Sequence, residues 1–272
     1  MADNTVALSA YAEDQFLNHV LRNTAHTNTT LYMALFTVDP TAAGTMTNEA
    51  TYTNYSRKAV TFGTAAASRS ISNTVAVNFD QCTGSSNTIT HYGIFDNATF
   101  QTGNMVTWGE ITPNKVVTTD NTPSVAIGQV TISVPASNGC SDYTANAFLS
   151  LMFEGTAFTS PANVYLALAS AAIIDADDGA GMDEVTGNSY ERSSTAVTFG
   201  VPTGSSPSST TTTNLIQFAT PTGSWTIQAM AIVDGLTEDA GNILFYDNSL
   251  DQTAETDDDV QYSIGDLTVT VT

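Results

Sequence analysis

The 272-residue chain has 27 acidic and 6 basic residues, which gives a formal net charge of −21. Nucleic-acid binding needs Lys and Arg to neutralise phosphates, so this charge argues against such a role. No run approaches the roughly 20 apolar residues that span a bilayer, and the first residues lack the basic start and apolar stretch of a secretory signal. We therefore expect synthesis in a cytoplasm and no membrane insertion.

The chain is expected to begin with a short amphipathic helix. Ser9 is a candidate N-cap, and Glu13 and Asp14 suit the positive end of the helix dipole. Apolar residues then recur at helical spacing, at Phe16, Leu17, Val20 and Leu21. Six runs rich in β-branched and aromatic residues predict strands at residues 31–37, 55–62, 74–79, 90–95, 105–110 and 126–134.

The same landmarks return in the second half of the chain, displaced by 132 to 139 positions. Ser141 is again a candidate N-cap. The stretch "AVTFG" occupies residues 59–63 and 196–200, and "IGQVTISV" from Ile127 corresponds to "IGDLTVTV" from Ile264. The drift in displacement is small, so the insertions are short loops and both copies should fold alike.

The repeat predicts two tandem β-rich modules, residues 1–138 and 139–272, joined by the Pro- and Ser-containing stretch 134–140. Each module is expected to be an antiparallel β-sandwich or small open barrel, opened by one short amphipathic α-helix, with its own core. The short linker predicts a pseudo-twofold or stacked arrangement. The charge is divided unevenly, because the first half has 9 acids and 5 bases (−4) and the second has 18 acids and 1 base (−17).

A repeated Glu, Tyr and Arg set is the main ionic signal. Glu49, Tyr55 and Arg57 return as Glu184, Tyr190 and Arg192 at a displacement of 135, and Arg192 is the single basic residue of the second half. A planar guanidinium suits a bidentate carboxylate partner, so Arg57 and Arg192 are predicted to form structural ion pairs that pin a loop to a strand. A clamp for a ligand carboxylate or a glycan is the alternative.

Catalytic signatures such as G-x-S-x-G, H-E-x-x-H and the P-loop are missing from the sequence, so we expect neither enzymatic activity nor a cofactor. Cys82 and Cys140 belong to no C-x-x-C pair, and two reduced thiols are expected, with a disulfide between them as the alternative.

Two further groups of residues are candidates for binding. Asp175, Asp177 and Asp178 superficially resemble a calcium loop, but the position of its invariant glycine falls on Ala180, so we expect solvated acids and no metal. The aromatic candidates are Trp108, Trp225 and Tyr246, which are expected to fill a core or an interface, with stacking on a glycan as the alternative.

Several motifs together resemble those of a family of tailed-phage virion proteins, of the tail fibre or decoration-like type. They are "LYMALFTVDP", "YSRKAVTFG", "HYGIFD", "GNMVTWGEIT" and the terminal "IGQVTISV". The first copy matches over residues 7–134, whereas the second copy has "AIVD" in place of "GIFD" and lacks the Asp-Pro turn. These motifs are structural, so they indicate fold and virion membership rather than binding residues.

The resemblance implies a non-enzymatic bacteriophage virion structural protein, made in the host cytoplasm and assembled with other virion proteins of the capsid or tail, as a homo-oligomer. A receptor-binding adhesin that recognises a host surface glycan is the alternative function. The resemblance leaves open whether the protein lies on the capsid or on the tail.

Overall fold

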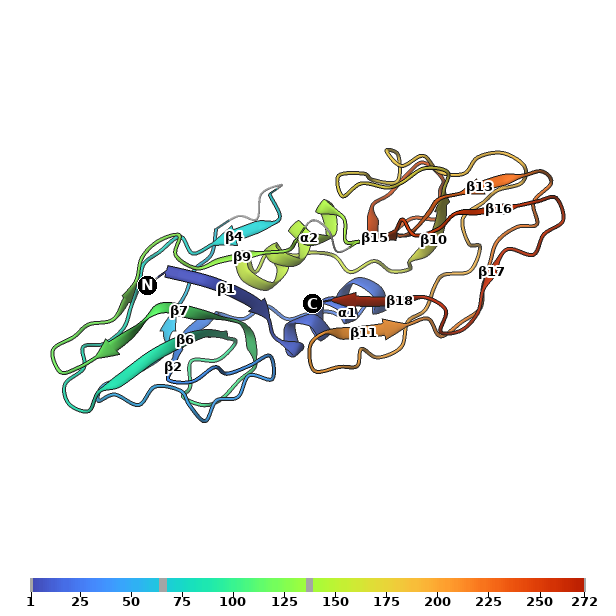
Figure 1. Ribbon diagram of the computed structural model, residues 1–272. Coiled ribbons are helices and arrows are strands. Elements are labelled where there is room, and N and C mark those ends of the chain that lie inside the picture. Colours follow the sequence, from blue (N-terminus) through green and yellow to red (C-terminus); the bar gives the residue numbers. More distant parts are fainter. Residues whose placement is uncertain (1, 64–67, 136–138, 272) are drawn as a thin grey trace.

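The computed structural model describes residues 2–63, 68–135 and 139–271, and the side chains from residue 7 onward. Short antiparallel strands and two α-helices form an elongated molecule, with most of the first half at one end and most of the second half at the other (Figure 1). The mainly β, antiparallel fold class predicted from the sequence is confirmed, and the described strands form no closed barrel.

The first half contains one helix and one five-stranded sheet, with strand order β1-β7-β6-β2-β3, and two separate strand pairs, β4-β9 and β5-β8. Its elements are β1 (Ala2–Leu8), α1 (Ala10–Arg22), β2 (Tyr32–Phe36), β3 (Lys58–Ala59), β4 (Ser70–Ser72), β5 (Val77–Asn78), β6 (Asn87–Phe95), β7 (Met105–Val117), β8 (Ser124–Val125) and β9 (Thr131–Ser133).

The second half repeats this order with a three-stranded sheet, β10-β14-β15, and the pairs β11-β18, β12-β17 and β13-β16. Its elements are α2 (Asp142–Leu149), a π-helical turn η1 (Ser150–Glu154), β10 (Tyr165–Ala169), β11 (Ser208–Thr211), β12 (Ile216–Gln217), β13 (Trp225–Ile227), β14 (Ala229–Val233), β15 (Ile243–Asp247), β16 (Gln252–Ala254), β17 (Gln261–Tyr262) and β18 (Thr268–Val271).

The predicted duplication appears in the strand register. Tyr32 on β2 lies opposite Phe95 on β6, and its counterpart Tyr165 on β10 lies opposite Val233 on β14. The same correspondence holds along all five paired positions of both strand pairs. Both helices also begin as predicted, because Ser9 accepts from the Ala12 amide and Ser141 from the Thr144 amide.

Two strands of the five-stranded sheet have no strand counterpart in the described part of the second half. One is the short β3, whose region is represented only by an isolated bridge between Val164 and Val197. The other is β1, which pairs with β7 at the edge of the sheet. Strand β1 was not predicted from the sequence, because its residues show neither alternation nor enrichment in β-branched residues.

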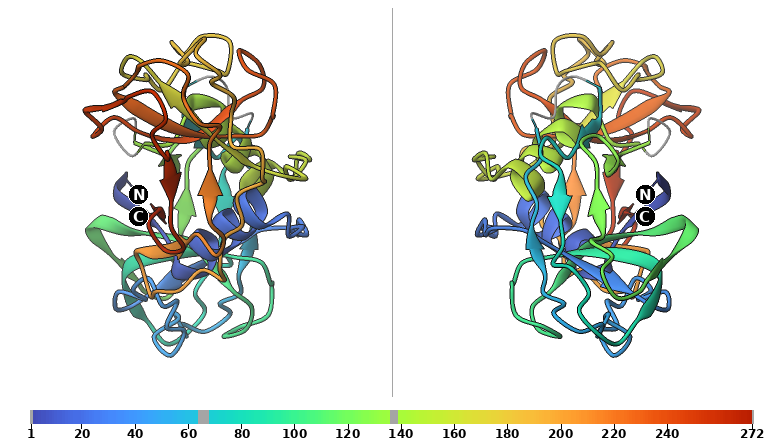
Figure 2. Two further views of the ribbon diagram at one scale, coloured as in Figure 1. Left: turned by 90° about the vertical axis from the view of Figure 1, so that its right-hand side faces the viewer. Right: turned by 90° about the vertical axis from the view of Figure 1, so that its left-hand side faces the viewer.

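The two helices lie in the middle of the molecule, between the outer loops of the two halves (Figure 2). Each helix contacts a strand pair of the other half: α1 lies against β11 and α2 against β4. Figure 1 shows α1 beside the β11-β18 pair and α2 beside the β4-β9 pair. Each helix also contacts its own half, α1 against β7 and α2 against β15, so each helix bridges the two halves across a pseudo-twofold centre.

This bridging by the helices produces one shared core, in contrast to the expectation that each half has its own. The main hydrophobic cluster contains residues from both halves, including Phe16 and Phe148, whose ring centroids are 4.3 Å apart. Phe62 of the first half likewise packs edge-on against Phe153 of the second. Among the residues that the structure describes, two smaller clusters each belong to a single half. The predicted boundary at residue 138 falls in segment 136–138, which lies outside the described residues.

Candidate functional site

A buried clamp joins Glu49 and Arg57 in the first half. The Arg57 Nε and Nη2 atoms each donate to one Glu49 carboxylate oxygen at 2.8 Å, and both side chains are 0% exposed. Arg57 Nη1 donates to the carbonyls of Asn97 and Thr102 at 2.9 and 2.8 Å, and the guanidinium lies 4.0 Å from the centre of the Phe95 ring. The clamp therefore fixes the loop that follows β6.

The second half contains the same clamp. Arg192 Nε and Nη2 donate to the Glu184 carboxylate at 2.8 and 2.7 Å, and Nη1 donates to the Gly235 and Ala240 carbonyls at 2.8 and 2.9 Å. Both side chains are again buried. The loop that follows β14 is thus held as its counterpart is held in the first half.

A tyrosine completes each clamp. The Tyr55 hydroxyl donates to Glu49 Oε1 at 2.9 Å and accepts from the Leu35 amide, and Tyr190 has the same arrangement with Glu184. Burial, and next the neighbouring carboxylate, raise the pKa of Tyr55 and Tyr190, so both hydroxyls stay protonated. Partners within the protein occupy the hydrogen-bonding groups of Arg, Glu and Tyr in each clamp, so these groups are not free to bind a ligand carboxylate or a glycan.

The calcium candidates are engaged within their own loops. Asp178 Oδ1 accepts from the Ala180 and Gly181 amides, and Asp177 Oδ2 accepts from the Ile174 amide. Asp175 accepts from the Tyr246 hydroxyl instead. Across the described residues, no group of three or more His, Cys, Asp or Glu side chains could hold a metal ion.

The three aromatic candidates do not form a common surface. Trp225 is only 1% exposed, and its Nε1 donates to the Asn188 carbonyl at 3.3 Å, so it fills the core and does not present its ring for stacking on a glycan. Trp108 is half-buried against a small cluster that belongs to the first half alone. Tyr246 is half-buried, and its hydroxyl donates a hydrogen bond to Asp175 of the same chain.

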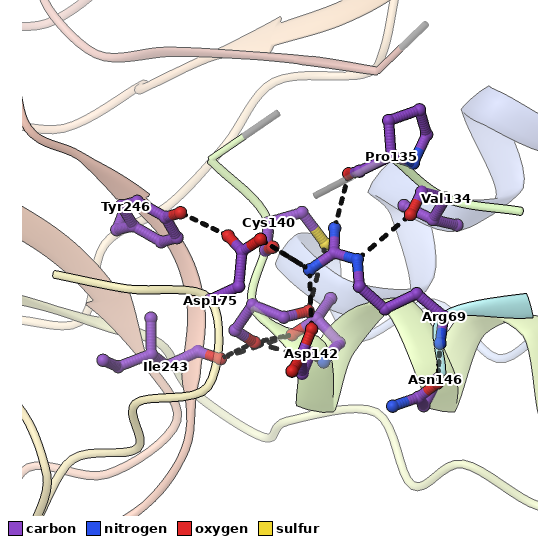
Figure 3. Close-up of polar contacts among 11 residues, drawn as sticks. Arg69, Val134, Pro135, Cys140, Asp142, Asn146, Asp175, Ile243 and Tyr246 are labelled. Atoms are coloured by element: carbon purple, nitrogen blue, oxygen red, sulfur yellow. Dashed lines mark hydrogen bonds and ion pairs between the residues drawn. The ribbon is translucent and has the colours of Figure 1, made fainter. Parts of the chain in front are cut away.

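Arg69 is a third buried arginine, and it connects the two halves (Figure 3). It precedes β4, and its Nη1 donates to the Cys140 carbonyl at 2.9 Å and to Asp142 Oδ1 at 3.0 Å, at the start of α2. Its backbone amide donates to Asn146 Oδ1 at 3.0 Å, one turn further along the helix. A strand of the first half is thereby attached to the helix of the second.

The same guanidinium holds the linker between the halves. Arg69 Nε and Nη2 donate to the carbonyls of Val134 and Pro135 at 3.0 and 2.7 Å, and Asp175 Oδ2 lies 3.5 Å from Nη1. We name Arg69 and these partners, with Cys140, Asp142 and Asn146, the Arg69 joint. Cys140 is buried and free, and burial raises the pKa of its thiol to about 12.

Glu13 makes the reciprocal connection, from α1 to the second half. Its carboxylate accepts from Ser206 Oγ at 2.7 Å and from the Ser208 amide at 2.8 Å, beside the start of β11. The next residue, Asp14, accepts from the Ser208 hydroxyl. The Glu13 side chain is buried, and this burial raises the pKa of its carboxyl above the ordinary value.

Sequence reasoning missed both connections. Arg69 corresponds to Ser208 in the second half, so the repeat contains no signal for it. From the sequence, Glu13 is expected only to suit the helix dipole. That expectation gives no indication of its contact with a segment almost 200 residues away. The one available signal was the rarity of arginine, because the chain has only six Lys and Arg residues in total.

Two adjoining hollows lie beside β15 and β18. The larger, of about 350 Å³, is lined by β14, β15 and β18, and includes Met230, Phe245, Asp247 and Val269. The smaller, of about 160 Å³, reaches Phe16 and Phe148 at the centre of the molecule. No helix in the described part of the chain has the length and apolar character that crossing a bilayer requires.

Comparison with known proteins agrees with this two-part architecture. A model of the podophage GP4 fiber I protein gp80 family matches the chain twice, over residues 7–133 and 139–270. No curated protein matches the chain. The double match confirms both the predicted resemblance to tailed-phage virion proteins and its two tandem copies. The chain therefore belongs to the podophage GP4 fiber I protein gp80 family, a family of phage structural proteins, and carries the family unit twice.

Proposed function

We propose that this chain is a non-enzymatic building block of the phage particle, of the fibre type rather than the capsid decoration type, that acts by assembling with other virion proteins. The observation that carries the proposal is the double match to a fiber protein family over nearly the whole chain. Its virion location, its synthesis in the host cytoplasm and its assembly as a homo-oligomer are parts of the same proposal.

The arrangement of the polar side chains supports this proposal. The buried arginines and glutamates of the two clamps form their hydrogen bonds with each other and with loops of the chain itself. A rigid scaffold requires such internal bonds, whereas an active site needs reactive groups that face a substrate. The alternative of a glycan-binding adhesin gains no support from the aromatic candidates, because Trp225 is buried and Tyr246 bonds inward.

The direct test is to locate the protein on purified particles. Antibodies raised against the full chain should label the tail region of intact particles in electron micrographs, and the chain should copurify with particles in fixed stoichiometry. Labelling of the capsid shell would contradict the fibre assignment. A chain that is abundant in the lysate but missing from purified particles would overturn the virion role itself.

A further inference from the structure

A further hollow lies between the two halves, at the C-terminal end of α1. Its volume is about 230 Å³, and it shares no lining residue with the two hollows beside β15 and β18. The first half contributes Leu21, Arg22 and Asn23 to its lining, and the second half contributes residues 161–164 and 196–199. The hollow therefore exists only where the two halves meet.

The repeat shows why space remains at this position. Leu21 corresponds to Phe153 in the second half, and the Phe153 ring packs edge-on against Phe62 with 5.2 Å between ring centroids. Phe62 in turn corresponds to Phe199, which lines the hollow together with Leu21. The matched site thus contains a pair of aromatic rings, whereas here a leucine faces a phenylalanine. The smaller leucine side chain leaves the volume that a second ring would fill.

Arg22 differs from the other arginines of the chain in its free hydrogen-bonding capacity. Three arginines donate from all three side-chain nitrogens to oxygens of the protein, namely Arg57, Arg69 and Arg192. Arg22 donates from Nε to the Phe199 carbonyl at 3.3 Å and from Nη1 to Asn18 Oδ1. Its Nη2 has no acceptor among the residues that the structure describes. The guanidinium is thus held in place with one nitrogen available to a ligand.

Two side-chain amides supply neutral polar groups to the same hollow. Asn23 and Asn163 both line it and are exposed, and neither side chain forms a hydrogen bond within the described part of the chain. A primary amide both donates and accepts hydrogen bonds, as a hydroxyl group does, so it suits a hydroxylated ligand. The buried residues Val164, Val197 and Phe199 form an apolar wall. The lining therefore combines a cation, two neutral polar groups and an apolar surface.

We infer that this hollow binds a sugar acid, a small polyhydroxylated carboxylate of the hexuronate class, with its carboxylate on Arg22. A guanidinium donates charge-assisted hydrogen bonds to a carboxylate, and the amides of Asn23 and Asn163 bind the hydroxyls. The matched site has Glu154 in place of Arg22, so its charge rejects the same ligand. The net charge of −21 repels anions from most of the chain, which makes carboxylate binding depend on a local cation. The inference does not rest on the virion role.

Titration of the full-length protein with sodium glucuronate tests the inference, with binding followed by saturation-transfer NMR. We expect one saturable site with a dissociation constant on the order of 1 mM, as is usual for a ligand of this size. Glucuronamide keeps the ring and its hydroxyls but lacks the charge, so it should bind about tenfold more weakly. Equal binding of the two compounds, or no saturable binding of glucuronate, would overturn the inference.

Methyl β-glucuronoside identifies the source of the sugar acid. Its methyl group takes the place at which a glycosidic bond would continue a polysaccharide. If it binds as glucuronate does, the hollow accepts a uronic acid within a polysaccharide chain. If it does not bind while glucuronate does, the ligand is a free sugar acid. Both results support the hollow as a sugar-acid site.

Matched variants test the location of the site. Arg22→Gln removes the cation but keeps N–H donors, so it should weaken glucuronate binding about tenfold and change glucuronamide binding little. Lys115→Gln removes the same charge at an exposed position outside the hollow and should leave both affinities unchanged. Undiminished glucuronate binding by Arg22→Gln, or an equal loss in Lys115→Gln, would contradict the inference.

A second variant tests the space rather than the charge. Leu21→Phe places at this position the side chain that Phe153 has at the matched one, so it should fill the hollow and weaken binding of both glucuronate and glucuronamide. Far-ultraviolet circular dichroism checks that the variant is folded. A folded Leu21→Phe protein that binds glucuronate normally would show that the ligand lies elsewhere.

Discussion

Arg57 and Arg192 each bury a whole guanidinium, which removes the hydration of both charges of the ion pair. The bidentate carboxylate and the two loop carbonyls replace that hydration, so the arrangement is tolerable only while every partner is present. A clamp of this kind contributes little net stability relative to an apolar core, but its disruption leaves an isolated buried charge. The repeated pattern of Glu, Tyr and Arg made this pairing predictable from the sequence.

The adjacent residues Arg57 and Lys58 provide a matched comparison. Arg57→Ala leaves the Glu49 carboxylate buried and unpaired, so we expect it to lower the free energy of unfolding by about 3–5 kcal/mol. Lys58→Ala removes an ion pair with Asp80 whose side chains are 27% and 38% exposed, and should cost at most about 1 kcal/mol. Urea unfolding measures both. Equal losses of unfolding free energy in the two variants would show that removal of Arg57 leaves no costly unpaired buried charge.

Glu13 gives the connection between α1 and β11 a pH dependence. Because burial raises the pKa of its carboxyl in the folded protein, the folded state binds more protons than the unfolded state just above the ordinary pKa of 4.5. The Glu13 contribution to stability is therefore complete below that value and is lost as the pH rises through the raised pKa.

Glu13→Gln removes this titration while it keeps an acceptor for the Ser208 amide. We expect the stability of the variant relative to the natural protein to increase between pH 4.5 and neutrality, as measured by urea unfolding at a series of pH values. The exposed substitution Glu191→Gln controls for the change in net charge. A relative stability that falls over this range would contradict the raised pKa.

At the scale of elements, the two helices that bridge the halves set the architecture. The quartets that begin at Phe16 and Phe148 were predicted as buried helix faces, and they are buried. What they pack against was not predictable, because a helical period indicates that a face is covered and does not identify the covering element. The contacts of α1 with β11 and of α2 with β4 depend on the short linker 134–140 and on unrepeated residues such as Arg69.

The strand predictions show the same limit. The runs at 31–37, 90–95 and 105–110 correspond to β2, β6 and β7, whereas the predicted strand 55–62 shrinks to β3 at Lys58–Ala59. The Tyr55 and Arg57 side chains in that run serve the clamp. Strand β1 carries no sequence signal, since its place is determined by the open edge of β7.

The thiol of Cys140 can report on the Arg69 joint. Cys82 and Cys140 are both free and buried, so a maleimide reagent should modify neither rapidly in the native protein. We expect Arg69→Ala to accelerate modification of Cys140 and to leave Cys82 protected. Removal of the guanidinium also removes a positive charge that lowers the Cys140 pKa, so a faster reaction would reflect opening of the joint. If Cys140 stays equally protected in the variant, Arg69 is not what shields the thiol from the reagent. Peptide mapping by mass spectrometry distinguishes the two sites.

At the scale of the whole molecule, we propose that the two halves, residues 1–138 and 139–272, form one folding unit. A duplicated sequence with a short linker predicts two similar folds in contact, and the strand registers agree with that prediction. The sequence could not predict that the main cluster combines both halves, because matched residues share their immediate surroundings even when the elements that cover them belong to the other half.

The chain offers one tryptophan in each half, so each half can be followed separately during unfolding. Trp225→Phe leaves Trp108 as the reporter of the first half, and Trp108→Phe leaves Trp225 as the reporter of the second. If the core is shared, each single-tryptophan protein should show the same transition midpoint by fluorescence and by far-ultraviolet circular dichroism. Addition of Arg192→Ala should lower the midpoint equally at both reporters. A first-half signal that keeps its midpoint while the second-half signal shifts would contradict the shared core.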